Sequence, residues 1–195
     1  MNMKSCLQEL RISLTATVSL AVLLCGIYPL AVWGISQGLF SQEANGSLIV
    51  KGGKTMGSSL LAQGFAGAKY FHPRPSVAGS GYDAAGSGGS NLGPLSKKLI
   101  DDVAQRVRDY RAVNRLAPDV GVPADAVSAS ASGLDAHISP QNAFLQAPRV
   151  ASARGLSREV VIEKIMAHTK GRTLGIFGEP RVNVLLLNLD LDGSS

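Results

Sequence analysis

The chain has 195 residues and a formal net charge of +5; 45% of its residues are hydrophobic, 17% are charged and only 5% are aromatic. This length suits one membrane segment followed by one domain that is large enough to bury its own core. Charges of both signs are scattered without a basic run, and with so few aromatic residues this pattern excludes a nucleic-acid-binding surface. The only cysteines are Cys6 and Cys25, so the rest of the chain has neither a disulfide framework nor a cysteine metal site.

The N-terminal segment is predicted to cross a membrane once. Residues 12–42 carry no charge and are dominated by Leu, Val, Ile and Ala, and about 20 apolar residues are enough to cross a bilayer as a helix. Lys4 and Arg11 precede this run, whereas the first charge after it is Glu43. Since positive charges favour the cytoplasmic side, we expect residues 1–11 in the cytoplasm, a transmembrane helix over residues 12–40 and a periplasmic domain over residues 41–195.

Two other interpretations of this segment are less favoured. A cleaved signal peptide has a shorter apolar core, but here the apolar run continues through Phe40. A lipoprotein needs a small residue before the modified cysteine, and here Leu24 precedes Cys25. We therefore expect an uncleaved anchor. Gly34 and Gly38 are four residues apart, a spacing that lets membrane helices pack closely, and they suggest a partner helix.

The exposed region is predicted to be a single mixed α/β soluble domain of the α+β class. Residues 44–67 are expected to form one or two strands separated by turns. Pro94 is expected to open an amphipathic helix whose buried face holds Leu95, Leu99, Val103 and Val107. Residues 79–93 are rich in Gly and Ser, and they fit either a flexible linker or an ordered loop held by its few larger side chains. We favour the ordered loop.

The C-terminal third is predicted to contain capped helices followed by two strands. Ser139 and Pro140 supply an N-cap and a first-turn proline for a helix to about residue 147, and Pro148 is expected to break or restart it. Ser157 is expected to cap the next helix. Residues 173–177 and 182–189 are expected to form strands. Because the second of these runs is almost wholly apolar, it is expected to be central in the sheet.

Two stretches are candidates for a functional surface. Residues 128–140, SASASGLDAHISP, fit either a tight structural turn before the next helix or a docking surface for a partner or a small anion. In YFHPRPS at residues 70–76, two prolines bracket Arg74 and fix an extended geometry, either for a rigid loop or for a contact with a partner. Asp135 and His137 are neighbours in a loop, which seldom orients a catalytic pair, and the three histidines lack the spacing of a zinc site. We predict no catalytic residue and no metal site.

Several motifs, taken in their order, resemble those of the C subunit of the Kdp potassium-transporting ATPase. They are YFHPRPS at residues 70–76, SGGSNLGP at 87–94, SASASGLDAHISP at 128–140, QAPRVASARGLS at 146–157 and LGIFGEPRVNVLLLNL at 174–189. The resemblance covers nearly the whole chain. It implies a non-catalytic accessory subunit of a high-affinity, ATP-driven potassium uptake complex in the cell inner membrane. The implied partners are the channel-like A subunit, the ATP-hydrolysing B subunit and the small F subunit, with potassium ion handled only indirectly.

The resemblance carries one mechanism in which nucleotide is involved. The subunit would be a catalytic chaperone that raises the affinity of the B subunit for ATP through a transient complex. The residues that would carry this effect are the turn at Ser132, Gly133 and Leu134, together with Gln141 or Gln146. No cofactor would be bound tightly.

A second mechanism places the domain outside, over the potassium entrance of the A subunit. The predicted topology favours this mechanism, because a periplasmic domain does not meet cytoplasmic ATP. We expect Arg74, Asp135 and His137 to line the surface that faces the A subunit. The alternative outside this family is a membrane-anchored periplasmic binding or sensor module, unrelated to a pump, with a ligand beneath residues 81–93.

Overall fold

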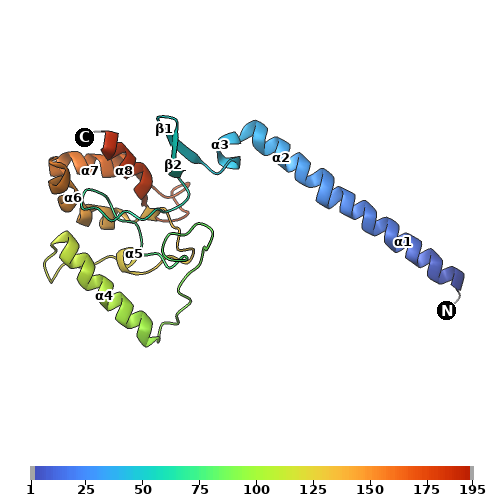
Figure 1. Ribbon diagram of the computed structural model, residues 1–195, viewed down its shortest axis with the longest axis horizontal. Helices are drawn as coiled ribbons and strands as arrows, with labels where there is room; N and C mark the ends of the chain where they lie inside the picture. The colour runs from blue at the N-terminus through green and yellow to red at the C-terminus, as the bar shows by residue number, and fades with distance from the viewer. Residues whose placement is uncertain (1–2, 194–195) are drawn as a thin grey trace. The chain divides into compact units, whose positions relative to one another are not determined.

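The computed structural model describes residues 3–193, and the chain divides into two compact units between residues 47 and 48. The first unit is a long apolar helix, made of α1 (Met3–Ala21), a π-helical stretch (Val22–Ile27) and α2 (Tyr28–Leu39), with the short α3 (Ser41–Ala44) after it (Figure 1). Within the described residues, Ser5–Leu39 is the one helix long and apolar enough to cross a membrane. A Cβ added at Gly34 or Gly38 meets no atom within 4 Å, so a partner helix on this face stays a prediction.

The second unit mixes helices and strands, as the α+β prediction requires. A hairpin of β1 (Leu48–Lys51) and β2 (Lys54–Ser58) is followed by a long segment without helix or strand. The remaining elements are α4 (Lys97–Asn114), α5 (Ala124–Val127), β3 (His137–Ile138), α6 (Pro140–Arg154), α7 (Arg158–Ala167), β4 (Thr169–Lys170), β5 (Arg181–Asn183) and α8 (Val184–Gly193). The three short strands β3, β5 and β4 form one antiparallel sheet in that order.

The core lies where α6, α7 and α8 pack around this sheet. Phe71, Ile138, Val150, Ile165 and Leu187 are among its fully buried side chains. α6 packs most closely on α7, and α4 lies along another side of α6 (Figure 1). The segment around Phe71, although it has no helix or strand, adds a fully buried side chain to this core.

Two buried amide side chains attach the segment around Phe71 to the helices. Asn188 on α8 accepts a hydrogen bond from the Phe71 N–H (2.8 Å) and donates one to the Phe71 carbonyl (3.0 Å). Gln146 on α6 accepts from the His72 N–H (2.8 Å) and donates to the His72 carbonyl (3.1 Å). Each amide thus replaces the pair of hydrogen bonds that a neighbouring strand would supply to an extended backbone.

The predicted helix caps are confirmed, whereas one predicted helix break and one predicted helix start are wrong. The hydroxyl of Ser139 accepts from the Asn142 N–H (3.1 Å) and that of Ser157 from the Val160 N–H (3.4 Å). Pro148, however, lies inside an unbroken α6. The first amphipathic helix begins at Lys97, so Leu95 lies outside it and is exposed.

Of the two strands predicted at the C-terminus, the first is wrong, and the second is confirmed only at its start, where β5 is central in the sheet as expected. Residues 173–177 form a turn closed by a single bridge between Thr173 and Phe177. Of residues 182–189, only Val182 and Asn183 are in β5, and helix α8 begins at Val184. The Asn183 side chain accepts a hydrogen bond from the Leu186 N–H (3.0 Å), as a helix cap does. Val184, Leu187 and Leu191 are buried at helical spacing, which explains why an apolar run is helical here.

Candidate functional site

The structure brings Arg74, Asp135 and His137 together. A guanidinium nitrogen of Arg74 lies 3.0 Å from Oδ2 of Asp135. The other carboxylate oxygen accepts from the backbone N–H of His137 (3.0 Å) and lies 3.5 Å from its Nδ1. All three side chains are half-buried and line an open groove of about 350 Å³. The groove thus joins the YFHPRPS stretch to the 128–140 stretch.

The backbone is held in place at each of these three residues. Pro73 and Pro75 hold the chain extended around Arg74, and the Tyr82 hydroxyl donates to the Arg74 carbonyl (2.9 Å). Asp135 is bridged to Leu61, and His137 pairs with Asn183 in the sheet. The groove is lined by Arg74, by residues between 125 and 139 and by residues 178–181, so it joins three regions far apart in the sequence on an ordered framework.

The Asp135 carboxylate is held in its charged form. Burial alone would raise the pKa of Asp135, but hydrogen bonds from the His137 side chain and backbone and from Arg74 outweigh it and lower the pKa to about 2. Asp135 and Arg74 are therefore both charged at neutral pH, and each is partly open to the groove. Such a pair is suited to polar contacts with another molecule.

Sequence reasoning missed three further charged residues of this groove. Glu179 and Arg181 lie on either side of Pro180, just where β5 begins, and Asp125 belongs to α5. The Asp125 carboxylate has a structural role, because it accepts hydrogen bonds from the Ser139 N–H (2.8 Å) and hydroxyl (2.9 Å). Prolines beside charged residues, as at Arg74, were the one signal that could have indicated Glu179 and Arg181.

The arrangement does not resemble a catalytic or metal centre. No serine hydroxyl is hydrogen-bonded to His137 in the part of the chain that the structure describes. Within the same residues, no group of three or more His, Cys, Asp or Glu side chains could hold a metal ion.

The turn at Ser132, Gly133 and Leu134 attaches the Gly- and Ser-rich loop to the domain. The Ser132 carbonyl accepts from the Gly88 N–H (2.9 Å) and from the Ser87 hydroxyl (3.0 Å). Leu134 is buried, and its carbonyl accepts from the Ala62 N–H (2.9 Å). Residues 79–93 are thus an ordered loop, as favoured from the sequence.

The two glutamines lie in different surroundings on α6. Gln141 is exposed, whereas Gln146 is almost completely buried. Besides its bonds to the His72 backbone, Gln146 donates to Oδ1 of Asn142 (2.9 Å) and accepts from Arg149 (2.8 Å). An amide has two donors and two acceptor positions, so the four bonds of Gln146 leave no free position for a ligand.

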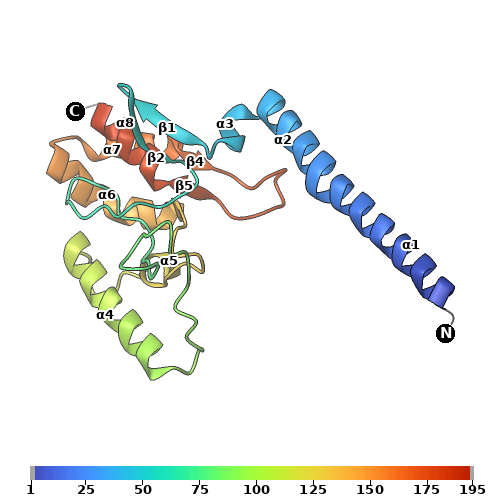
Figure 2. The ribbon, with the colours of Figure 1, turned by 45° about the vertical axis from the view of Figure 1, so that its right-hand side comes forward.

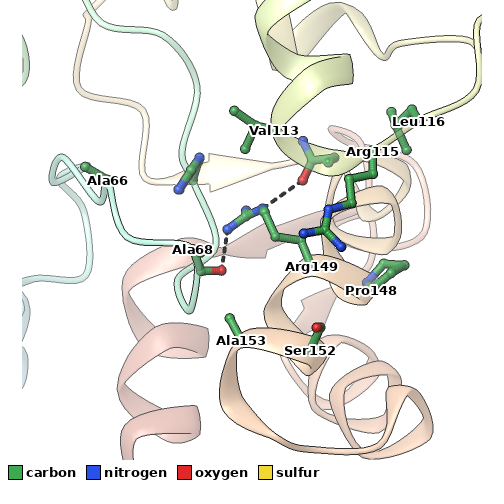
Figure 3. Close-up of a pocket in the computed structure, with 11 residues that line it drawn as sticks. Ala66, Ala68, Val113, Arg115, Leu116, Pro148, Arg149, Ser152 and Ala153 are labelled. Atoms are coloured by element: carbon green, nitrogen blue, oxygen red, sulfur yellow. Dashed lines mark hydrogen bonds between the residues drawn. The ribbon is translucent and has the colours of Figure 1, made fainter.

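A second hollow lies between the end of α4 and α6 (Figure 3). This cavity of about 590 Å³ is lined by small and apolar side chains and by Arg115 and Arg149. The Arg149 guanidinium bonds to four neutral acceptors, which are Oδ1 of Asn114 (2.9 Å), the carbonyls of Ala68 (2.6 Å) and Tyr70 (2.9 Å), and Gln146. None of the lining residues comes from residues 81–93, so this cavity is not the ligand site expected beneath that loop.

Comparison with known proteins identifies the family. The family model described as "K+-transporting ATPase, c chain" matches residues 10–193. The chain belongs to this family. It is 52% identical to the potassium-transporting ATPase KdpC subunit of Rhodospirillum rubrum over 95% of this chain and 96% of that protein. It is also 52% identical to the KdpC subunit of Mycobacterium tuberculosis over 95% of this chain and 98% of that protein.

A third relative, the KdpC subunit of Myxococcus xanthus, is 56% identical over 85% of this chain and 79% of its own length. The family resemblance of the sequence motifs is therefore confirmed. Family membership supports an accessory-subunit role in the potassium-transporting ATPase.

Proposed function

We propose that this chain is the non-catalytic subunit of an ATP-driven potassium uptake complex, held in the cell inner membrane by its single helix. Its relatives are named as KdpC subunits of the potassium-transporting ATPase, and the partners would be the A, B and F subunits. Lys4 and Arg11 lie before the helix and Glu43 after it, which supports a cytoplasmic N-terminus and a periplasmic domain.

The domain would dock on the A subunit, at its potassium entrance, through the groove of Arg74, Asp135 and His137. The observation that carries this proposal is the Arg74–Asp135 pair, in which two permanent charges are held in fixed positions while remaining partly open to solvent. Fixed charges at a rim give an interface its specificity and orientation. Glu179 and Arg181 extend the same rim.

An effect on ATP affinity would then be indirect. Gln146 is buried with all four hydrogen-bonding positions used, and the turn at Gly133 is engaged with the loop at residues 79–93. A subunit that binds one state of the pump more tightly than the others shifts that pump's nucleotide affinity without touching nucleotide. We therefore propose that the chaperone effect on the B subunit passes through the membrane subunits.

Sidedness is the first test. A single cysteine at Ala84, an exposed loop position, in a Cys6→Ser, Cys25→Ser background is exposed to a membrane-impermeant thiol reagent in intact cells. Labelling without lysis is expected. Labelling only after lysis would refute the periplasmic location, and it would favour the mechanism in which this chain contacts nucleotide directly.

The groove is tested by reversing its ion pair. Arg74→Asp and Asp135→Arg are made singly and together, and recovery of the assembled complex and potassium-dependent ATP hydrolysis are measured. If a partner recognises the two charges, the double variant keeps the internal pair but remains at least about tenfold weaker in assembly. Full rescue by the double variant would show that the pair is only structural. Asp102→Asn, which breaks the exposed Lys98–Asp102 pair on α4, is the control.

A further inference from the structure

A loop at residues 171–180, between β4 and β5, exposes three large apolar side chains. Leu174 is 84% exposed, Ile176 74% and Phe177 64%, and every residue of this tip loop is exposed. Figure 2 shows the loop extending from β4 and β5, away from α6 and α7. These side chains therefore contribute nothing to the core of their own domain.

The tip loop is nevertheless an ordered structure. The Thr173 N–H donates to the Phe177 carbonyl (2.8 Å), and the Phe177 N–H donates back to the Thr173 carbonyl (2.9 Å). Arg172 holds both carboxylate oxygens of Glu179 at 2.8 Å across the base of the loop. Leu174 has a φ of +54°, a conformation that L residues rarely adopt. The unfavourable backbone conformation at Leu174 is therefore kept in a loop whose large apolar side chains contact only solvent. This combination indicates that these side chains contact an apolar environment outside the domain.

The charges beside the tip indicate what that environment is. Lys170, Arg172 and Arg181 stand at the base of the loop against the single acid Glu179. An apolar tip above basic residues is the pattern of segments that enter the headgroup region of anionic bilayers. A narrow tip also buries too little area for a stable protein interface, which needs about 1,000 Å².

The domain is held within reach of the bilayer. Only residues 40–47 separate the end of α2 at Leu39 from the start of β1 at Leu48, and a chain of this length spans at most about 30 Å when fully extended. Because this short linker keeps the domain at a high effective concentration near the bilayer, even a weak contact between the domain and lipid would be populated.

We propose that the tip loop inserts Leu174, Ile176 and Phe177 into the interfacial region of the bilayer that the N-terminal helix crosses. The base of the loop, at Glu179 and Arg181, also lines the groove. Insertion would therefore hold the groove close to the membrane surface, where an embedded partner presents its entrance. This inference concerns lipid and does not depend on which partner uses the groove.

The experiment places a fluorophore at the tip. Phe177→Trp is made in a Trp33→Phe background, which leaves one tryptophan in the full chain. The chain is reconstituted into vesicles of phosphatidylcholine and phosphatidylglycerol, with or without bromine on the acyl chains. The matched control is Met166→Trp in the same background, since Met166 is 64% exposed but lies on α7.

We expect blue-shifted emission from the tip tryptophan, and at least about twofold quenching by brominated lipid, with water-like, unquenched emission from the control. Water-like emission from the tip would overturn the proposal. A blue shift without quenching would also overturn it, since it would indicate a protein pocket or a second copy. Replacing phosphatidylglycerol with phosphatidylcholine should weaken the quenching, because the base of the loop is basic.

Discussion

Substituting Gly133 with alanine is expected to destabilise the domain by about 2–5 kcal/mol. Gly133 has a φ of +68°, and an L residue in this left-handed region costs roughly 1–2 kcal/mol. The new Cβ would lie 2.7 Å from the Ala78 Cβ, 2.8 Å from the Gly88 carbonyl oxygen and 2.9 Å from the Ala78 nitrogen. None of these atoms belongs to a flexible side chain that can swing aside, so overpacking adds about 1–3 kcal/mol.

Chemical unfolding of the full chain in detergent, followed by circular dichroism, measures this loss. Hydrogen exchange at the Gly88 amide, which donates to the Ser132 carbonyl, reports whether the 79–93 loop detaches. Gly155→Ala is the matched control, because Gly155 has a φ of +66° but an added Cβ meets nothing within 4 Å. Gly155→Ala should therefore be destabilised only by the unfavourable backbone conformation, by roughly 1–2 kcal/mol.

The difference between the two variants isolates the close approach of the loop to the turn. Equal destabilisation by Gly133→Ala and Gly155→Ala, with protection at Gly88 unchanged, would refute the reasoning. A lower ATP affinity of the assembled pump with unchanged stability would instead assign this turn to nucleotide.

Three further predictions concern the amide side chains and the groove. Gln146→Ala should cost about 2–4 kcal/mol because it removes a buried amide and leaves the half-buried His72 backbone groups unpaired, whereas Gln141→Ala at an exposed position should stay within about 0.5 kcal/mol in the same unfolding assay. Asn188→Ala should match Gln146→Ala, since it performs the same role at Phe71. The folded-state pKa of Asp135 is about 2, below its ordinary value of 3.8. Its stabilisation is therefore complete above about pH 4 and lost as the pH falls through 2, and Asp135→Asn should flatten the acid limb of a plot of melting temperature against pH.

Local signals in the sequence were enough to predict part of this fold. Ser139 and Ser157 cap helices because a hydroxyl reaches the backbone N–H three residues on, and that contact depends only on neighbours in the chain. The same kind of signal was present at Asn183, which caps α8. It was outweighed by the apolar run that follows, which satisfies strand and buried-helix patterns equally well.

Contacts between distant segments could not be predicted in this way. Asn188 and Phe71 are 117 residues apart, and Gln146 and His72 are 74 apart. Nothing near Gln146 in the sequence shows that its partner is a piece of backbone in an extended loop. The resemblance to a family offered Gln146 as a nucleotide-affinity residue, and only the fold shows how completely its amide is used.

The amide of Gln146 suggests how the two mechanisms can be reconciled. Its hydrogen bonds to the His72 backbone hold the segment in which Arg74 lies two residues further on. They thereby help to position the Arg74 side chain beside Asp135 in the groove. Loss of Gln146 would therefore release Arg74 as well as destabilise the domain, and any fall in the ATP affinity of the pump would arise at the groove. The Arg74 side chain is not part of the core, so Arg74→Gln should cause little loss of stability. On this reasoning it should nevertheless lower the ATP affinity of the pump about as much as Gln146→Ala does. A nucleotide effect of Gln146→Ala that Arg74→Gln does not reproduce would contradict a route through the groove.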